Sequence, residues 1–409
     1  MNAAIAAHRV ARVETWIVTL PREQPYLGKP GPGDVLTSNG YLVRGGNRTL
    51  YPTVDRSVLV RVSSAAGTVG WGETYGIVAP EAVTAIIADV LGPLLLGRDP
   101  LDPAALNAEF YDLQRVRGFW GGFWGDALVA IDIALWDLAG QLSGQPVVDL
   151  LTAASEIRVP RAPAAALGAY VSGLPAPTLA GRVEMARSFA ARGFEAFKFA
   201  AAVSFDGIVE EMRALRAGLG PGPRIAVDLH WKFTVDEAAT LIEQLAPWQP
   251  WFVEAPCAPE DADAQGELAA RVAAGCGVPI ALGEEWHNLH VALPRLRRRA
   301  LQIIQPEVAH TGLSQFMAIG QAARARGLAI IPHATIGTGV FMAASLHGAA
   351  ALGASMHEYQ HSVFDRNLGL LDTTMGCAAG SYVLPKGCGL GVAPNAALWP
   401  HARKTGDIG

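Results

Sequence analysis

Three acidic residues each close an apolar segment in the second half of the chain. They are Asp228 in IAVDLH, Glu254 in WFVEAP and Glu284 in IALGEEW. Their spacing fits one strand and one helix per step, so in a parallel sheet the three side chains would converge at the carboxyl edge. Converging carboxylates repel one another unless a cation neutralises them, and an all-oxygen set suits Mg²⁺ before Mn²⁺ or Ca²⁺. The pattern predicts one Mg²⁺ per subunit, although each acid alone could instead cap a helix or pair with an arginine.

A glutamate and a histidine close the next two apolar segments, Glu307 in IIQPEV and His333 in AIIPHA. A carboxylate that is hydrogen-bonded to one imidazole nitrogen fixes the tautomer and raises the basicity of the other nitrogen. The pair therefore predicts a general base. Taken alone, His333 could equally be a hydrogen-bonded core histidine.

Two further polar residues are expected to face the same point. His230 lies two residues after Asp228, so strand alternation directs both side chains to one face and makes His230 a candidate second acid or base. Lys198 interrupts the apolar run GFEAFKFA, where an inward lysine could bind an anionic substrate. The alternatives are that His230 only supports Asp228 and that Lys198 only forms a salt bridge with a metal-binding carboxylate.

The elements that must position these residues alternate regularly from about Pro160 onward, with short β-branched or aromatic runs followed by amphipathic stretches. Eight such units predict an α/β fold in which a (β/α)₈ barrel, a modified TIM barrel, is favoured over an open doubly wound sheet. The predicted strands cover residues 166–171, 196–199, 224–230, 251–254, 280–284, 303–308, 329–333 and 355–359. The predicted helices include residues 181–192, 205–217, 235–245, 265–274, 291–300 and 313–326.

The first 158 residues lack this alternation and predict an α+β capping domain that ends in a helix leading to the barrel. We expect the catalytic barrel to span residues 159–375 and the segment 376–409 to pack back on the cap. Within the cap we predict strands over 12–20 and 57–63, a long loop over 21–52 and a helix over 80–96. A Gly- and Pro-rich loop of that length is usually a functional lid or disordered.

Together these motifs resemble the enolase superfamily, specifically the mandelate racemase subgroup and its acid sugar dehydratases. The resemblance covers nearly the whole chain. GWGET at 70–74 and ALVAIDIALWDLAGQLSGQPVVDLL at 127–151 look like the family's cap and cap-to-barrel helix. The resemblance implies that Glu284 is the third metal ligand and that His333 and Glu307 form the catalytic dyad.

The same resemblance implies further site residues. Glu358, in SMHEYQ, looks like the acid that hydrogen-bonds the enediolate opposite the metal, for which it would have to be protonated; it could as easily be a partner of Lys198. In the cap loop, Tyr41, Arg44 and Arg48 could contact the far end of the substrate, although an arginine in a Gly-rich loop is more often solvated.

Two departures from the family pattern help to choose the reaction. Ala200 stands where the family often has a second lysine base, and the dyad acid is Glu307 where Asp is usual. A racemase needs a base on each face of the α-carbon, whereas a histidine at the position of His230 is similar to the general acid of galactonate and mannonate dehydratases. We therefore expect a hydro-lyase in which His333 removes the 2-proton and His230 protonates the departing 3-hydroxyl, giving a 2-keto-3-deoxy acid.

Two alternatives remain open. The chain could be an isomerase, a racemase or epimerase of a 2-hydroxy acid, with His230 or Lys198 opposite His333. It could also bind an acid sugar without turning it over, because an altered dyad and a missing lysine can mark lost catalysis. Retention of all three metal acids argues against this second alternative.

Composition limits the kind of partner and the cellular location that we expect. A net charge of −5 and a pI near 6.1 argue against a broad nucleic-acid surface. There is no run of about 18 apolar residues that could span a membrane, and four sparse cysteines do not form a disulfide framework. We expect a cytoplasmic protein with reduced thiols that acts on a small molecule. The 51% hydrophobic content favours a large core and a homo-oligomer.

Overall fold

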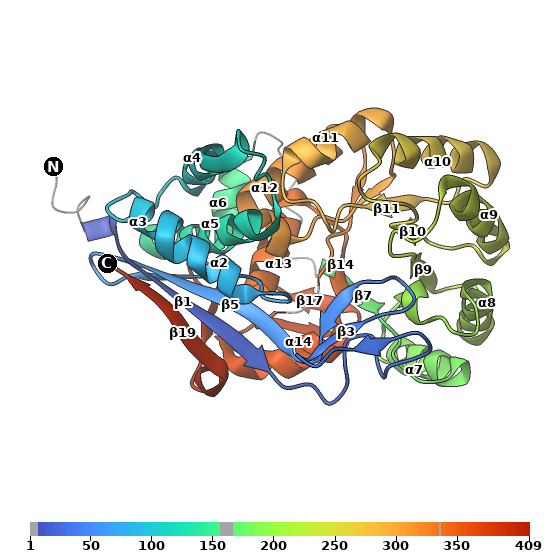
Figure 1. Cartoon of the computed structure of the whole chain (residues 1–409). Helices are drawn as coiled ribbons and strands as arrows, with labels where there is room; N and C mark the ends of the chain where they lie inside the picture. The colour runs from blue at the N-terminus through green and yellow to red at the C-terminus, as the bar shows by residue number, and fades with distance from the viewer. Residues whose placement is uncertain (1–6, 156–166, 335–336) are drawn as a thin grey trace.

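The computed structural model of the chain describes residues 7–155, 167–334 and 337–409. In these ranges parallel strands follow chain order around a barrel from β7 to β13, and β14 pairs with β7. The Glu358 amide donates to the Pro332 carbonyl at 3.2 Å, which joins β14 to the segment after β13 and closes the ring. The predicted (β/α)₈ barrel is confirmed (Figure 1). Its strands are β7 (Leu167–Ser172), β8 (Ala196–Ala200), β9 (Arg224–Asp228), β10 (Val253–Glu254), β11 (Ile280–Leu282), β12 (Ile303–Ile304), β13 (Ala329–Ile330) and β14 (Met356–Tyr359).

Several strands end earlier than the apolar pattern predicts. The strand predicted to reach residue 230 ends at Asp228, because His230 adopts a left-handed backbone with φ of 52°. Pro306 and Pro332 have no amide hydrogen to donate to the ladder, and they lie beyond the shortened ends of β12 and β13. Several of the chemically active residues therefore lie on loops just past the strands. Of the predicted elements, Ala166 lies outside the described residues, as does the predicted domain boundary at 158.

Helices cover the outside of the barrel, and α9 shows how the sequence specifies them. Thr234 and Glu237 form a capping box at its N-terminus. Its buried side chains, including Ala238, Ile242 and Leu245, repeat at helical spacing and face the strands. The barrel-side helices are α7 (Leu179–Ala191), α8 (Ile208–Leu219), α9 (Val235–Leu245), α10 (Ala262–Gly275), α11 (Leu289–Arg298), α12 (Val308–Arg324), α13 (Val340–Leu352) and α14 (His361–Asn367).

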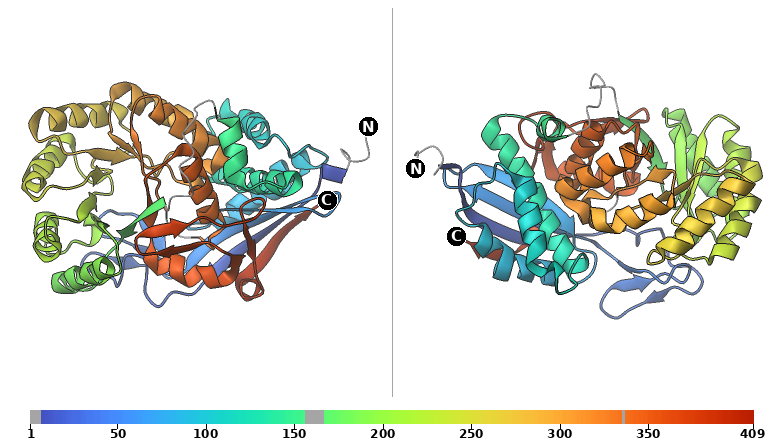
Figure 2. Two further views of the ribbon diagram at one scale, coloured as in Figure 1. Left: turned by 180° about the vertical axis from the view of Figure 1, so that it is seen from behind. Right: turned by 90° about the horizontal axis from the view of Figure 1, so that it is seen from above.

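The cap is an antiparallel sheet of strand order β19-β1-β5-β6 with helices packed on it. Its C-terminal strand β19 pairs with β1, so the first and last strands of the chain lie side by side (Figure 2). Residues 376–383, which were also predicted to pack on the cap, instead form a hairpin that pairs with barrel strand β7. The cap elements are β1 (Val10–Leu20), β5 (Asp55–Ser64), β6 (Val69–Tyr75), α2 (Pro80–Ile86), α3 (Gly92–Leu95), α4 (Pro103–Arg115), α5 (Gly122–Ser143), α6 (Val147–Ala154) and β19 (Ala402–Ile408). The strands between the barrel and β19 are β15 (Leu371–Thr373), β16 (Gly376–Ala378), β17 (Ser381–Val383) and β18 (Val392–Pro394).

The segment 21–52, predicted to be a structureless loop, contains a small antiparallel sheet of its own. Its strands are β2 (Val35–Leu36), β3 (Tyr41–Val43) and β4 (Leu50–Pro52). We call this segment the cap excursion. It leaves the cap sheet after β1 and returns to it before β5, so its two ends are fixed by neighbouring strands.

The motif at the end of β6 ties the cap to the barrel. A Cβ atom on Gly72 would lie 1.9 Å from the Ala130 carbonyl oxygen, so only glycine allows α5 to pack this closely on the sheet. Glu73 is fully buried and accepts hydrogen bonds from the Thr338 amide and, at 3.1 Å, from the Phe341 amide at the start of α13. The next residue, Thr74, donates to the Ala309 carbonyl at 2.8 Å.

No helix within the described ranges is long and apolar enough to cross a membrane.

We predict that Glu73→Ala lowers the free energy of unfolding by about 3 kcal/mol, because two buried amides at the start of α13 lose their acceptor. Urea denaturation followed by circular dichroism measures the change. Glu81→Ala is the matched control: it removes an exposed carboxylate paired with Arg403, and we expect a loss below about 1 kcal/mol. Equal losses in the two variants would contradict the role given to Glu73.

Candidate active site

A cavity of about 250 Å³ lies at the carboxyl ends of the barrel strands, under the cap excursion. The barrel supplies its charged lining, and the cap supplies aromatic and apolar groups. The charged and titratable residues that line it include Lys198, Asp228, His230, Glu284, His333 and Glu358. Six of the residues predicted from the sequence therefore share one cavity.

The three predicted metal acids lie on neighbouring positions of the barrel mouth. Asp228 and Glu254 end β9 and β10 and are paired directly in the sheet register, and Glu284 follows β11. Ligand atoms of Glu254, Glu284 and His333 all lie within 4.8 Å of one another. Asp228 is instead turned to His230, whose Nε2 is 3.0 Å from its Oδ2 and whose amide donates to its Oδ1 at 2.9 Å.

These acids carry more negative charge than the neighbouring residues compensate. Glu254 Oε1 is buried and has no hydrogen-bond partner among the described residues, while Oε2 accepts from Lys198 at 2.7 Å and from Gln305 at 3.1 Å. Burial raises the pKa of Glu254 well above its usual range, and the charges of Asp228 and Glu284 add to this effect although Lys198 opposes it. An orphaned carboxylate oxygen beside two more acids fits a hard divalent cation.

The predicted dyad is formed. His333 Nδ1 lies 2.9 Å from Glu307 Oε2, so the extra methylene of glutamate does not prevent contact. Tyr75 donates to the same oxygen at 3.1 Å, and the Ala309 amide donates to Oε1 at 2.9 Å. The other ring nitrogen, Nε2, faces Glu284 at 2.9 Å. Burial lowers the pKa of His333, but the charge of Glu284 and its other carboxylate neighbours outweighs burial and raises it well above its usual range.

Lys198 lies between two carboxylates. Its Nζ is 2.7 Å from Glu254 and 3.2 Å from Glu358, and Tyr170 donates to Glu358 at 3.0 Å. Burial raises the pKa of Glu358, but the charges of His333 and Lys198 outweigh it and bring the pKa below its usual range. Glu358 is thus a carboxylate here, which fits its alternative role as a partner of Lys198 better than the protonated donor that the family resemblance implied.

The structure does not bring the three cap residues predicted to contact the substrate, Tyr41, Arg44 and Arg48, into the cavity lining. Arg44 is fully buried and binds Asp34 at 2.7 Å and the Gly28 carbonyl at 2.6 Å, so its guanidinium holds the cap excursion together. The Tyr41 ring lies under the guanidinium of Arg56, 4.9 Å away. Arg48 is exposed to solvent. None of the three is among the residues that line the cavity.

Other residues of the cap excursion line the cavity in place of Tyr41, Arg44 and Arg48. Tyr26, Leu27, Thr49 and Tyr51 line the cavity, and the Gln360 amide donates to the Tyr26 hydroxyl at 2.9 Å. An aromatic residue inside a Gly- and Pro-rich segment was the available signal, because such a segment has little core of its own to bury a tyrosine.

Sequence reasoning also missed Tyr75 and His310. Tyr75 directly follows the GWGET motif. His310 lies three residues after Glu307, on the first turn of α12, and helical spacing puts Glu307 and His310 on one side of this helix. Both line the cavity.

A second, larger cavity of about 690 Å³ continues from the first one between the cap excursion and the barrel loops. Ala200 lines both cavities, together with Tyr26, Gly173 and Gln360. The small side chain at 200 therefore stands where the two spaces meet.

Comparisons with known proteins agree with this geometry. Residues 51–152 match the family described as mandelate racemase / muconate lactonizing enzyme, N-terminal domain, and residues 181–398 match the enolase C-terminal domain-like family. The D-galactarolactone cycloisomerase of Agrobacterium fabrum is 32% identical over 83% of this chain and 89% of its own length. The D-galactonate dehydratase of Ralstonia pickettii is 28% identical over 86% of this chain and 92% of its own.

Several solved structures are closer in sequence, and one of them illustrates the match. It is a protein from Sinorhizobium meliloti provisionally named an isomerase, with 51% identity and a TM-score of 0.92, and the match covers 97% of this chain and 100% of that one.

We predict that Arg44→Met loosens the cap excursion, because the buried carboxylate of Asp34 and several carbonyl groups lose their donor. Chymotryptic cleavage within residues 21–52, followed by mass spectrometry, should become about tenfold faster or more. Arg48→Met, which changes an exposed arginine in the same segment, should leave the cleavage rate unchanged. A rate in Arg44→Met equal to that of the wild type would contradict the structural role.

Proposed function

The chain belongs to the mandelate racemase and muconate lactonizing enzyme group of the enolase superfamily, and we propose that it is a dehydratase of an acid sugar. It would remove the proton next to the carboxylate of an aldonate or aldarate and expel the 3-hydroxyl, leaving a 2-keto-3-deoxy acid. The observation that carries the proposal is the His333–Glu307 pair, 2.9 Å apart, with the other ring nitrogen of His333 facing Glu284 in a cavity lined by carboxylates.

Asp228, Glu254 and Glu284 would hold one Mg²⁺. The orphaned Oε1 of Glu254 and the all-oxygen donor set support this choice. A bound Mg²⁺ would supply positive charge that offsets the charge developing on the substrate carboxylate. Lys198 adds a second positive charge on the same side of the barrel and compensates Glu254 and Glu358.

The proton steps fall to the histidines. His333 takes the 2-proton on Nε2 while Glu307 keeps the tautomer and orientation of the ring. Tyr75 holds the Glu307 oxygen that contacts the ring. His230, on the opposite part of the barrel mouth, is the acid expected from the sequence for the departing 3-hydroxyl.

Dehydration is favoured over racemisation by the residue at 200. With Ala200 in place of a lysine, the face of the α-carbon opposite His333 lacks that base. The D-galactonate dehydratase relative supports the same reaction class, whereas the D-galactarolactone cycloisomerase relative makes an isomerase the second candidate. Both reactions begin with the same proton abstraction.

A homo-oligomer stays a prediction. Val116, Phe119, Trp120 and Phe123 form an exposed apolar group between α4 and α5, which is the kind of surface that subunit contacts cover.

We predict that the purified protein binds one Mg²⁺ by isothermal titration calorimetry, and that Glu254→Gln weakens binding at least tenfold, because a carboxylate ligand becomes a neutral amide. Glu267→Gln, an exposed glutamate on α10, is the control and should bind as the wild type does. Unchanged binding in Glu254→Gln would remove Glu254 from the ligand set.

We further predict that one acid sugar among galactonate, gulonate, talarate and rhamnonate gives 2-keto-3-deoxy product, read as semicarbazide absorbance. His333→Asn should lower the rate by about 10²- to 10⁴-fold through loss of the general base. His290→Asn changes an exposed histidine and should have no effect. If deuterium enters recovered substrate and no water is lost, the reaction is racemisation or epimerisation and not dehydration. If a lactone is converted without loss of water, the reaction is that of a cycloisomerase.

A further inference from the structure

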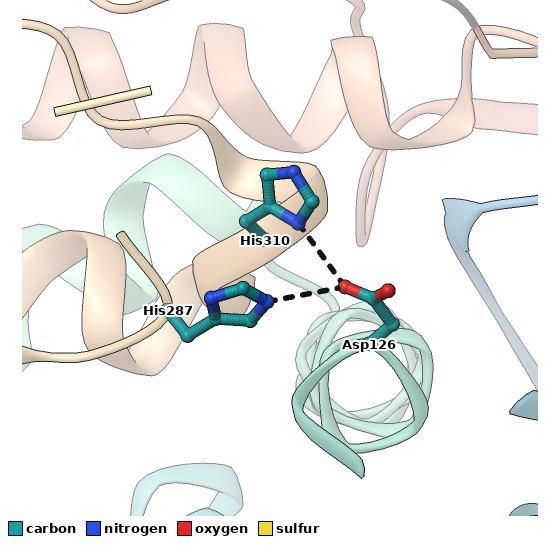
Figure 3. A group of neighbouring side chains, drawn as sticks. All are labelled: Asp126, His287 and His310. Atoms are coloured by element: carbon teal, nitrogen blue, oxygen red, sulfur yellow. Dashed lines mark hydrogen bonds and ion pairs between the residues drawn. The ribbon is translucent and has the colours of Figure 1, made fainter. Parts of the chain in front are cut away.

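A second group of histidine and carboxylate side chains lies beside the site and has no part in the mechanism above. It consists of Asp126 at the start of α5, His287 in the loop after β11 and His310 on the first turn of α12 (Figure 3). Asp126 is buried, and its Oδ1 lies 3.1 Å from His310 Nδ1 and 3.6 Å from His287 Nε2. The three come from segments far apart in the sequence.

The hydrogen bonds decide which histidine belongs to Asp126. The Gly122 amide donates to His287 Nε2 at 3.1 Å, so the lone pair of this nitrogen is occupied and the nitrogen carries no proton. It lies 3.6 Å from Asp126 Oδ1, farther than His310 Nδ1, and it could bind a metal ion only by losing the amide. The proton that Asp126 accepts is the one on His310 Nδ1.

The Asp126–His310 pair thus repeats the construction of Glu307–His333. In each pair a buried carboxylate holds Nδ1 and leaves Nε2 for another partner. Among the described residues nothing is hydrogen-bonded to His310 Nε2, and 27% of the His310 side chain is exposed.

His310 also lies in the right place to act on a substrate. It lines the same cavity as Glu284 and His333. Its ring packs against Tyr75, with centroids 4.5 Å apart, and the Tyr75 hydroxyl binds the dyad acid Glu307. His310 and His333 follow the adjacent strands β12 and β13, whereas His230 follows β9.

We propose that His310, held by Asp126, is a second catalytic acid of this cavity and protonates the departing 3-hydroxyl on the same side from which His333 takes the 2-proton. The inference rests on the proposed dehydration and names its acid. Burial lowers the pKa of His310, but the hydrogen bond and charge of Asp126 outweigh burial and raise it above its usual value, which favours the imidazolium form. His230, by contrast, has Nε2 at 3.0 Å from Asp228 Oδ2 and Nδ1 at 3.3 Å from the Asp228 carbonyl.

The step is balanced. The C2–H bond breaks, its proton passes to His333 and its electron pair forms the enediolate. That electron pair then forms the C2=C3 double bond as the C3–O bond breaks, and the 3-hydroxyl leaves as water with the proton from His310 Nε2. The enol that remains loses its hydroxyl proton and gains one at C3, while solvent takes the proton from His333 and returns one to His310.

The test measures two rates in one set of samples in ²H₂O with Mg²⁺ and the acid sugar found by the screen. Loss of the C2–H signal in the proton NMR spectrum reports abstraction, and semicarbazide absorbance reports product. In His310→Gln we expect product formation to fall about 10²-fold or more while C2 exchange stays within about threefold of the wild type. Retained exchange also shows that the variant is folded.

Three companion variants sharpen the result. Asp126→Asn should follow His310→Gln, because a neutral amide does not stabilise the imidazolium. His333→Asn should lose both rates. His287→Gln should keep both, because its Nε2 only accepts from the Gly122 amide.

Each contrary outcome overturns the proposal in a recognisable way. Wild-type product formation in His310→Gln, with the loss found in His230→Gln instead, returns the acid role to His230. Equal loss of exchange and product in His310→Gln makes the residue structural. Stoichiometric Zn²⁺ that the wild type retains and His287→Gln loses makes the cluster a metal site. A wild type that releases no product from any acid sugar overturns the proposed function itself and the acid role with it.

Discussion

The density of buried negative charge at the mouth of the barrel is the constraint on which the rest of the site depends. Glu254, Glu307 and Glu358 are each about 1% exposed, and isolated carboxylates buried to this degree would take up protons unless they were paired. Lys198 lies between Glu254 and Glu358, and His333 contacts Glu307. Lys198 and His333 are each held by the acids around them, so the positions of these groups depend on one another.

Much of this arrangement could be predicted because the barrel converts sequence order into spatial order. Asp228 and Glu254 end successive strands, and the parallel register places them side by side. The same logic gave Glu307 and His333. Prediction from the sequence failed where a contact depends on the path of an irregular segment. The residues around Arg44 do not show whether its guanidinium faces a substrate or binds Asp34 within the same loop.

Residues contributed from outside the β-α period were also beyond prediction. Tyr75 reaches the dyad only because β6 of the cap ends beside α12, and Asp126 reaches His310 only because α5 packs between the cap and the barrel. The predicted strands were too long at their C-terminal ends for a different reason. The apolar pattern continues past residues such as Pro306, Pro332 and His230, but at these residues the backbone no longer forms the strand. Four of the candidate site residues lie in these short extensions past the strand ends: His230, Glu284, Glu307 and His333.

The attachment of the cap through Glu73, Thr74 and Tyr75 has a consequence for the assembly of the two domains. These three consecutive residues contact α13, α12 and the dyad acid in turn. A barrel that has folded before its cap has docked would lack the hydroxyl that steadies Glu307 and the roof over its acids. If the chain carries out the proposed reaction, proton abstraction would therefore require that the cap and the barrel have assembled.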